Sequence, residues 1–283
     1  MQQHQRMVLI SAMSALLYGG WGSLLDLAMR SGDSIPLVGT LLFGIGTVIS
    51  LIASRGKVER PNKMIVLGAV AFFVANAELL YVMRHTELDS AYVFVPSSML
   101  VFFGLTALRY RPSTSAKKRA TAAVLLAVLG MTLAEMSGVS VNAWILFVGL
   151  TLTLVYGVAS YAVIAQMLSK PSAEAFWASL IQTVLFAAFL LLMPASPSLE
   201  LSLYSLGAGI LVVFGFQLEL ESVAIANRSA SKFTNLNLVN VIANMDSVVV
   251  IAFSVLIGTA TLNGVLGLLL VFVSVSVLYP SQG

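Results

Sequence analysis

Long apolar stretches, separated by short polar breaks, run along the whole chain. A transmembrane α-helix needs about 20 mostly apolar residues. The pattern predicts ten such helices, at residues 7–29, 36–53, 63–84, 89–109, 118–136, 142–168, 173–193, 203–226, 230–257 and 262–279. The breaks carry turn residues and charges, as in SGDSIP, RYRPSTSAKKR and PASPSLE, and none is long enough to hold a domain. The predicted fold class is therefore an all-α integral membrane protein with ten transmembrane helices.

Basic residues gather in alternate breaks, which gives the chain a predicted orientation. Counted from the N-terminus, the odd-numbered breaks hold only Arg30 and Arg84 of the 15 lysines and arginines. The other 13 lie in the N-terminal segment and the even-numbered breaks. Because Lys and Arg are enriched in cytoplasmic loops, both termini are predicted to be cytoplasmic. We expect a multi-pass protein of the inner (plasma) membrane.

Composition supports a membrane location and narrows the range of partners. Hydrophobic residues make up 59% of the 283 positions and charged residues 10%, whereas a soluble domain carries about 25% charged residues. The net charge is +3, but the basic residues are spread over short loops, so we do not expect a nucleic-acid partner. The chain has no cysteine and only two histidines, His4 and His85, so neither a metal site nor a cofactor is expected. The expected partners are the lipid bilayer and a small-molecule substrate, and the expected state is a monomer.

The two halves of the chain show a weak internal repeat. Shifting the sequence by 141 positions aligns FFVANAELL (72–80) with VFGFQLELE (213–221). The matched pairs are Asn76 with Gln217, Glu78 with Glu219 and, at a slightly smaller shift, Tyr18 with Tyr156. The order predicts a five-helix half at 1–137 and a second at 138–283, which enters the membrane from the opposite side because five is odd. In many transporters such inverted repeats place the substrate at their interface, near mid-membrane.

Several stretches carry a resemblance to a known family: YGGWGS (18–23), ELLYVMRHTELDSAYVFVPSSM (78–99), ELESVAIANRSASKFTNLNLVNVI (219–242) and LNGVLGLLLVFVSVSVL (262–278). With these stretches the chain resembles the drug/metabolite transporter superfamily in its ten-helix form. Pro96 supplies the proline usual in helix 4 of that family, whereas Asn237 takes the corresponding position in helix 9. The resemblance implies two inverted five-helix halves, a substrate cavity lined by helices 1, 3, 4, 6, 8 and 9, and alternating access.

Acidic residues are the main candidates for chemistry. Ionisable residues inside spans are costly and usually face the bundle interior or a water-filled cavity. Six acids fall in or near the predicted spans, and no basic residue falls inside them: Asp26, Glu78, Glu135, Glu219, Glu221 and Asp246. Such an interior suits a cation, a zwitterion or a proton. Glu78, Glu219 and Asp246 are the candidates for proton coupling, and repeat matching favours Glu219 over Glu221 as the cavity acid. The alternative is that these acids only lock neighbouring helices together.

Amides and aromatic rings complete the candidate site. Asn237, Asn240 and Asn244 share one face of the predicted ninth helix, which should turn toward the cavity or toward helix 8. Tyr81 follows Glu78 by three residues, so the ring and the acid are spaced to hold one ligand cation together. The alternatives are interhelical hydrogen bonding for the amides and packing for the rings. The predicted substrate-binding residues are Tyr18, Trp21, Asn76, Glu78, Tyr81, Tyr92, Tyr156, Gln217, Glu219, Asn237, Asn240 and Asn244.

These observations favour a secondary active transporter rather than an enzyme. The substrate expected is a small polar, cationic or zwitterionic metabolite, such as an amino acid or amine, moved by alternating access with or without proton coupling. The chain has no nucleotide-binding loop, so ATP-driven transport is not expected. Two alternatives remain open: a membrane-embedded lipid-modifying enzyme and a lipid-carrier flippase of the same superfamily.

Overall fold

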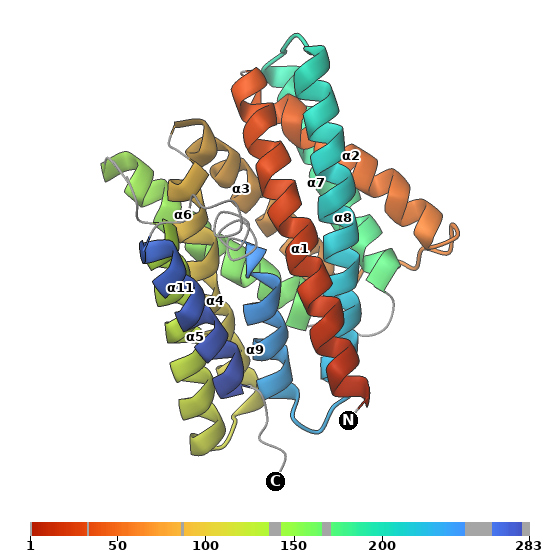
Figure 1. Ribbon diagram of the computed structural model, residues 1–283. Helices are drawn as coiled ribbons and strands as arrows, with labels where there is room; N and C mark the ends of the chain where they lie inside the picture. Colours follow the sequence, from red (N-terminus) through yellow and green to blue (C-terminus); the bar gives the residue numbers. More distant parts are fainter. Residues whose placement is uncertain are drawn as a thin grey trace.

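The computed structural model describes residues 2–32, 34–85, 88–135, 143–165, 171–246 and 262–278, and it contains no strand among them. Figure 1 shows the helices as one bundle, with the N-terminal helix alongside α8. The helices are α1 (Gln2–Ser31), α2 (Ile35–Ala53), α3 (Lys63–His85), α4 (Leu88–Tyr110), α5 (Thr114–Glu135), α6 (Ala143–Ser160), η1 (Tyr161–Ala165), α7 (Pro171–Leu192), α8 (Leu199–Asn227), α9 (Lys232–Ala243) and α11 (Leu262–Leu278).

The helices are long and apolar enough for a membrane protein. Among the described residues, six stretches meet the length and hydropathy expected of a membrane span: they lie in α1, α2, α3, α6 with η1, α7 and α8. Two shorter apolar stretches, Phe94–Tyr110 and Val265–Leu278, lie in α4 and α11. Large apolar side chains cover the outside of the bundle, with Leu108 76% and Leu191 85% exposed. Because a soluble monomer rarely exposes so much contiguous apolar surface, this surface faces lipid. The chain is an all-helical membrane protein.

Helices α2 and α8 each follow a serine of a polar break, and that serine caps the first turn. Before α2, the hydroxyl of Ser34 accepts a hydrogen bond from the backbone N–H of Leu37 (3.2 Å), and Pro36 follows in the first turn. Before α8, Ser198 accepts in the same way from the backbone N–H of Leu201 (3.1 Å). Each serine satisfies a backbone donor that the helix itself leaves open.

The prediction of one continuous helix at 230–257 is wrong at Asn244, where α9 ends. The Asn244 side chain donates to the backbone carbonyl of Asn240 (2.8 Å), and its backbone N–H donates to the same carbonyl (3.3 Å). Asparagine side chains compete for backbone groups in this way and often stop helices. Asp246 lies just beyond the break, and residues 247–257 fall outside the described residues.

The predicted sixth helix, 142–168, also changes form along its length. It is α-helical over Ala143–Ser160 and continues as the π-helical turn Tyr161–Ala165. Such turns are rare and frequently lie at functional sites. Residues 166–168 fall outside the described residues.

Helix packing brings distant parts of the chain together. The most extensive contacts join α1 to α8, α5 to α11, α2 to α7 and α3 to α6. Further contacts join α2 to α8, α3 to α7, α4 to α6 and α1 to α9. At the crossing of α2 and α8, Gly209 lies directly against the backbone of Leu42. The absence of a side chain at this glycine permits the close approach.

Candidate functional site

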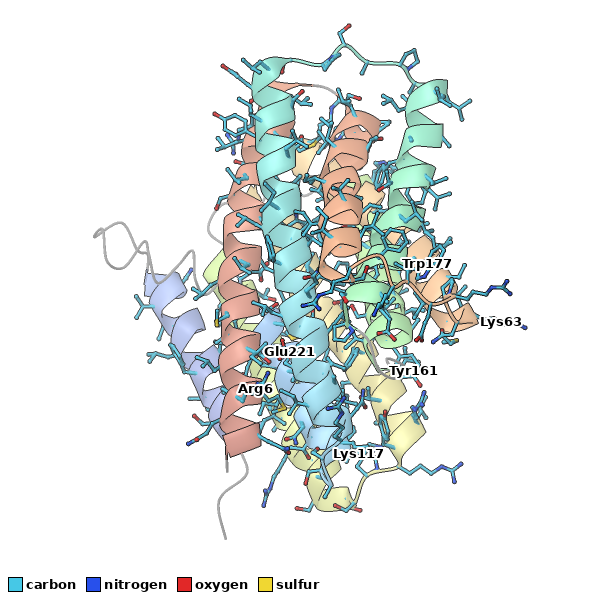
Figure 2. All side chains as sticks on the ribbon, turned by 90° about the vertical axis from the view of Figure 1, so that its right-hand side faces the viewer. Arg6, Lys63, Lys117, Tyr161, Trp177 and Glu221 are labelled. Carbon is cyan, nitrogen blue, oxygen red and sulfur yellow. The ribbon has the colours of Figure 1, made fainter. Side chains whose placement is uncertain are left out.

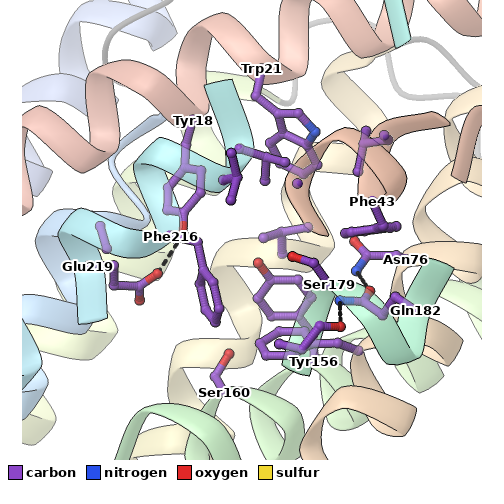
Figure 3. Close-up of a pocket in the computed structure, with 18 of the residues that line it drawn as sticks. Tyr18, Trp21, Phe43, Asn76, Tyr156, Ser160, Ser179, Gln182, Phe216 and Glu219 are labelled. Carbon is purple, nitrogen blue, oxygen red and sulfur yellow. Dashed lines mark hydrogen bonds between the residues drawn. The ribbon is translucent and has the colours of Figure 1, made fainter. Parts of the chain in front are cut away.

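A cavity of about 70 Å³ lies inside the bundle, between helices from both halves of the chain (Figure 3). Its lining comes from α1, α2, α3, α4, α6, η1, α7, α8 and the end of α9. The polar and aromatic residues of the lining are Tyr18, Trp21, Phe43, Phe72, Asn76, Tyr156, Ser160, Ser179, Gln182, Phe216, Glu219, Asn244 and Asp246.

Glu219 of α8 forms an acidic corner with Tyr18 of α1. The phenol of Tyr18 donates to Oε2 of Glu219 at 2.7 Å, and the Glu219 side chain is 5% exposed overall. The close packing of α1 on α8 sets this geometry. Ser14 donates to the backbone carbonyl of Gly215 (2.7 Å), and a Cβ added at Gly215 would lie 3.0 Å from the Tyr18 ring. A side chain at this position would therefore push the tyrosine away from its acid.

The break after α9 contributes a second acid to the lining. Ala243, Asn244 and Asp246 all line the cavity, and the Asp246 side chain is only 4% exposed. Because α9 ends at Ala243, the C-terminal end of this helix forms part of the cavity wall. Two carboxyl groups, those of Glu219 and Asp246, therefore border the same space.

A pair of neutral amides forms the opposite part of the wall. Asn76 of α3 donates to Oε1 of Gln182 of α7 at 2.8 Å, and Gln182 in turn donates to the backbone carbonyl of Ala178 (3.1 Å). Ser179 lies one position further along α7 and is also buried. Figure 3 shows Tyr18 and Glu219 on one side of the cavity and this amide pair on the other.

Aromatic rings fill the space between the acidic and amide sides. Phe72 contacts Tyr156 edge-on, with ring centroids 5.4 Å apart, and also contacts Phe216 at 6.2 Å. Tyr18 and Trp21 form a further edge-on pair at 6.2 Å. Edge-to-face packing of this kind is a favoured arrangement of aromatic rings. The Nε1 of Trp21 is buried and has no hydrogen-bond partner among the described residues.

The charge of the cavity has one sign. Within the described part of the chain, the lining holds two acids and no lysine, arginine or histidine. A buried carboxylate is stabilised by a nearby cation or by a proton. The cavity is thus suited to a guest that brings positive charge or a proton. No group of three or more His, Asp or Glu side chains is placed to hold a metal ion among the described residues.

Comparison with known proteins adds information on the fold alone. No protein-family model and no curated protein sequence matches the chain. A solved structure titled "Crystal structure of protein" superposes with a TM-score of 0.73, and the match covers 96% of each chain. The two chains share one fold. Their sequence identity is 15%, so the match shows the fold alone.

Glu78 and Tyr81, predicted to hold a ligand together, lie outside the cavity. Glu78 accepts a hydrogen bond from Thr151 of α6 at 2.9 Å. The Tyr81 hydroxyl accepts from Nε1 of Trp144 (3.1 Å), and its ring stacks on His85. The structure therefore places both on the α3–α6 interface rather than in the cavity lining.

Other predicted residues also lie away from the cavity. On the opposite face of α8, Gln217 donates to Ser50 of α2 (3.2 Å) and Glu221 pairs with Arg6 of α1 (2.6 Å). Asn237 donates to Thr106 of α4 (3.3 Å). Asn240 is buried and accepts from Asn244, which does line the cavity. Tyr92 belongs to α4, but its side chain falls outside the described residues.

Sequence reasoning missed several lining residues, of which Gln182 is the most informative. The signal was nevertheless present, since a glutamine in the middle of an otherwise apolar span is itself a candidate for the bundle interior. Phe43, Phe72 and Phe216 carried no such signal, because phenylalanine in a span is ordinary packing material.

Proposed function

We propose that this protein is a secondary transporter of small organic cations, such as amines. The observation that carries the proposal is the internal cavity, bordered by two acids and several aromatic rings with no basic residue in its described lining. Carboxylates attract a cation, and the faces of aromatic rings add about 0.5–2 kcal/mol each when a cation lies over them. A free amino acid fits less well, because nothing basic in the described lining matches its carboxylate.

Hydrogen bonding at the opposite side supports a polar substituent on the substrate. The amides of Asn76 and Gln182 are bonded to each other, and Ser160 and Ser179 lie on the same lining. A molecule with an ammonium group near Glu219 and a hydroxyl or carbonyl near Gln182 would satisfy both sides. The aromatic rings between them suit an apolar linking segment.

The pattern of helix contacts supports a chain built from two five-helix halves. If α1 to α5 correspond to α6 to α9 and α11, the most extensive helix pairings each have a counterpart. The α1–α8 contact corresponds to α6–α3, the α2–α8 contact to α7–α3, and the α4–α6 contact to α9–α1. The contacts α2–α7, α4–α9 and α5–α11 each correspond to themselves, as expected for helices next to a two-fold axis.

Hydrogen bonds also repeat across equivalent helix contacts, and in each pair of bonds one partner is a residue that the sequence shift matches: Glu219 with Glu78, and Asn76 with Gln217. Tyr18 donates to Glu219 across α1–α8, and Thr151 donates to Glu78 across α6–α3. Asn76 bonds Gln182 across α3–α7, and Gln217 bonds Ser50 across α8–α2. These correspondences support an inverted repeat. An inverted repeat in turn supports membership of the drug/metabolite transporter superfamily. It also supports an even number of spans with both termini in the cytoplasm.

Alternating access follows from a cavity that lies between such halves. Rocking of one half against the other would open the cavity to each side of the membrane in turn. Glu219 is our main candidate for proton coupling, since a bound cation and a proton would compete for one carboxylate. Asp246 borders the same space and is the second candidate. Glu78, held by Thr151 outside the lining, is the third.

The proposal is tested by ligand-dependent thermal unfolding of the purified protein. Amines, quaternary ammonium compounds, amino acids and sugar phosphates would each be added over a wide concentration range. A ligand at 100 times its dissociation constant should stabilise the folded state by about 2.7 kcal/mol. We expect stabilisation by amines, and we expect Glu219→Gln to remove it.

The matched control is Glu200→Gln, at the exposed start of the same helix, which should leave the ligand response unchanged. Counterflow of a labelled hit into proteoliposomes then separates a transporter from a binding protein. Stabilisation by sugar phosphates alone would contradict the proposed charge selectivity. An amine response that survives in Glu219→Gln would contradict the assigned site.

A further inference from the structure

A second concave region lies on the outer face of α8, apart from the central cavity. It has a volume of about 700 Å³ and shares no described lining residue with the cavity. Its lining residues are Arg6, Leu17, Ala53, Pro171, Ser172, Phe214, Gln217, Leu218, Glu221, Ala224, Ile225 and Arg228. We call this region the α8 groove. The floor is α8, one wall is α1, and the other wall is the end of α2 with the start of α7.

The length of the α8 groove matches one leaflet of a bilayer. Arg228 directly follows α8, and Phe214 lies 14 residues earlier, which is about 21 Å along a helix. On the α1 wall, Arg6 and Leu17 are 11 residues apart, or about 16 Å. Half of a hydrocarbon core of about 30 Å is about 15 Å, to which the headgroup layer adds several ångströms. The groove therefore runs from headgroup level into the hydrocarbon.

Charge and apolar surface are separated along this length. Arg6 and Arg228 lie at the end of the groove where α1 begins and α8 ends. Toward the membrane interior the lining is Leu17, Phe214 and Leu218, and Phe214 is 46% exposed. A ligand with an anionic head and an apolar tail matches this order.

The two arginines are accessible to such a head. Arg6 pairs with Glu221 at 2.6 Å, yet the Arg6 side chain is 66% exposed (Figure 2). Arg228 is exposed and makes no ion pair with any described residue. One acid and two guanidinium groups leave a net positive charge at this end. Guanidinium groups bind phosphate through paired hydrogen bonds, and Glu221 holds Arg6 in position without neutralising both.

We propose that the α8 groove binds an anionic phospholipid of the leaflet in which α1 begins. Its phosphate would contact Arg6 and Arg228, and an acyl chain would lie along Leu218, Phe214 and Leu17. A zwitterionic lipid brings no net negative charge to this end, so selectivity for anionic headgroups follows. Basic pockets at the membrane surface recognise lipids by this physical principle. The site is independent of transport.

The test uses the full chain in detergent–lipid micelles and in nanodiscs. Phosphatidylglycerol is titrated against phosphatidylcholine of the same acyl chains, with glycerol phosphate as a soluble source of the same headgroup. Thermal unfolding and native mass spectrometry report stabilisation and bound lipid. We expect phosphatidylglycerol to bind and to raise Tm more than phosphatidylcholine does, and glycerol phosphate to have no effect at millimolar concentration.

Variants then locate the site. Arg228→Gln and Arg6→Gln should each weaken phosphatidylglycerol binding about fivefold. Arg119→Gln, at an exposed position of α5 that is not part of the groove lining, is the matched control and should bind as the unaltered protein does. The lipid titration on the unaltered protein needs no variant, so a failure of one variant to fold leaves the test intact.

Three results would overturn the proposal. The first is equal binding of the two lipids. The second is a loss in Arg119→Gln as large as that in Arg228→Gln, which would show unspecific surface attraction. The third is an equal effect of glycerol phosphate, which would show a site for a soluble phosphate rather than for a lipid.

Discussion

The crossing of α2 and α8 offers the sharpest test of the packing that shapes the cavity. Gly209 lies on α8, and a Cβ added there would overlap the carbonyl oxygen of Leu42 and the side chain of Ile45. The carbonyl carbon of Leu42 would be 3.1 Å away. Because one of the overlapped atoms belongs to the backbone, a rotamer change cannot relieve the clash. Gly209→Ala must therefore push α2 and α8 apart.

The cost of that separation has two parts of opposite sign. Overpacking a close contact costs about 1–3 kcal/mol, while replacing glycine by alanine in a helix returns about 1 kcal/mol. Gly104→Ala is the matched control, because no described heavy atom lies within 4 Å of its added Cβ. It should keep the helix gain and raise the unfolding free energy by up to about 1 kcal/mol. The two variants should thus differ by about 1–3 kcal/mol.

Thermal unfolding in one detergent, followed by circular dichroism, measures this difference. At roughly 2–4 °C per kcal/mol for a chain of this size, Gly209→Ala should melt about 2–12 °C below Gly104→Ala. A Gly209→Ala protein as stable as the Gly104→Ala control would show that α2 and α8 do not approach as described. The lining positions that depend on this crossing would then need to be revised.

Two further substitutions test local interactions by the same melting assay. Ser34→Ala removes the N-cap of α2 and should lower the unfolding free energy by about 1 kcal/mol. Ser231→Ala should lower it by less than half as much, because Ser231 makes no side-chain cap bond. Equal losses of stability in the two variants would contradict the capping role of Ser34. Tyr18→Phe removes the 2.7 Å hydrogen bond to Glu219 and should cost about 1.5–3 kcal/mol if the acid is ionised. Tyr156→Phe, whose hydroxyl bonds no described side chain, should cost less, and identical melting of the two variants would refute the assignment.

Helix positions could be predicted from the sequence because membrane spans are long and their apolar signal is strong. The predicted span 203–226 falls inside α8, and the prediction at 36–53 matches α2 to within one residue. Helix starts that follow a polar break, such as the start of α2 after Ser34, could also be predicted, because polar residues interrupt the apolar run. The end of α9 was missed because Asn244 stops the helix by local hydrogen bonds, which hydropathy does not register.

Side-chain direction was harder to predict than depth. Asn76, Glu219 and Tyr18 line the cavity, and all three were predicted through the repeat. The same repeat also selected Glu78 and Gln217, which face neighbouring helices instead. A repeat relates equivalent positions, but an asymmetric cavity does not use both members of each pair. Only the packing of the surrounding helices decides which member faces the open space.

The end of α9 at Ala243 has an electrostatic consequence. Aligned peptide dipoles place roughly half a negative charge at the C-terminus of a helix. Ala243 and Asn244 line the cavity, so this negative pole lies at its wall, inside the bundle where little water is present to screen it. The field comes from the backbone and does not depend on either carboxyl group. A protein with both Glu219 and Asp246 replaced by their amides would therefore still favour a cation over an anion in this space.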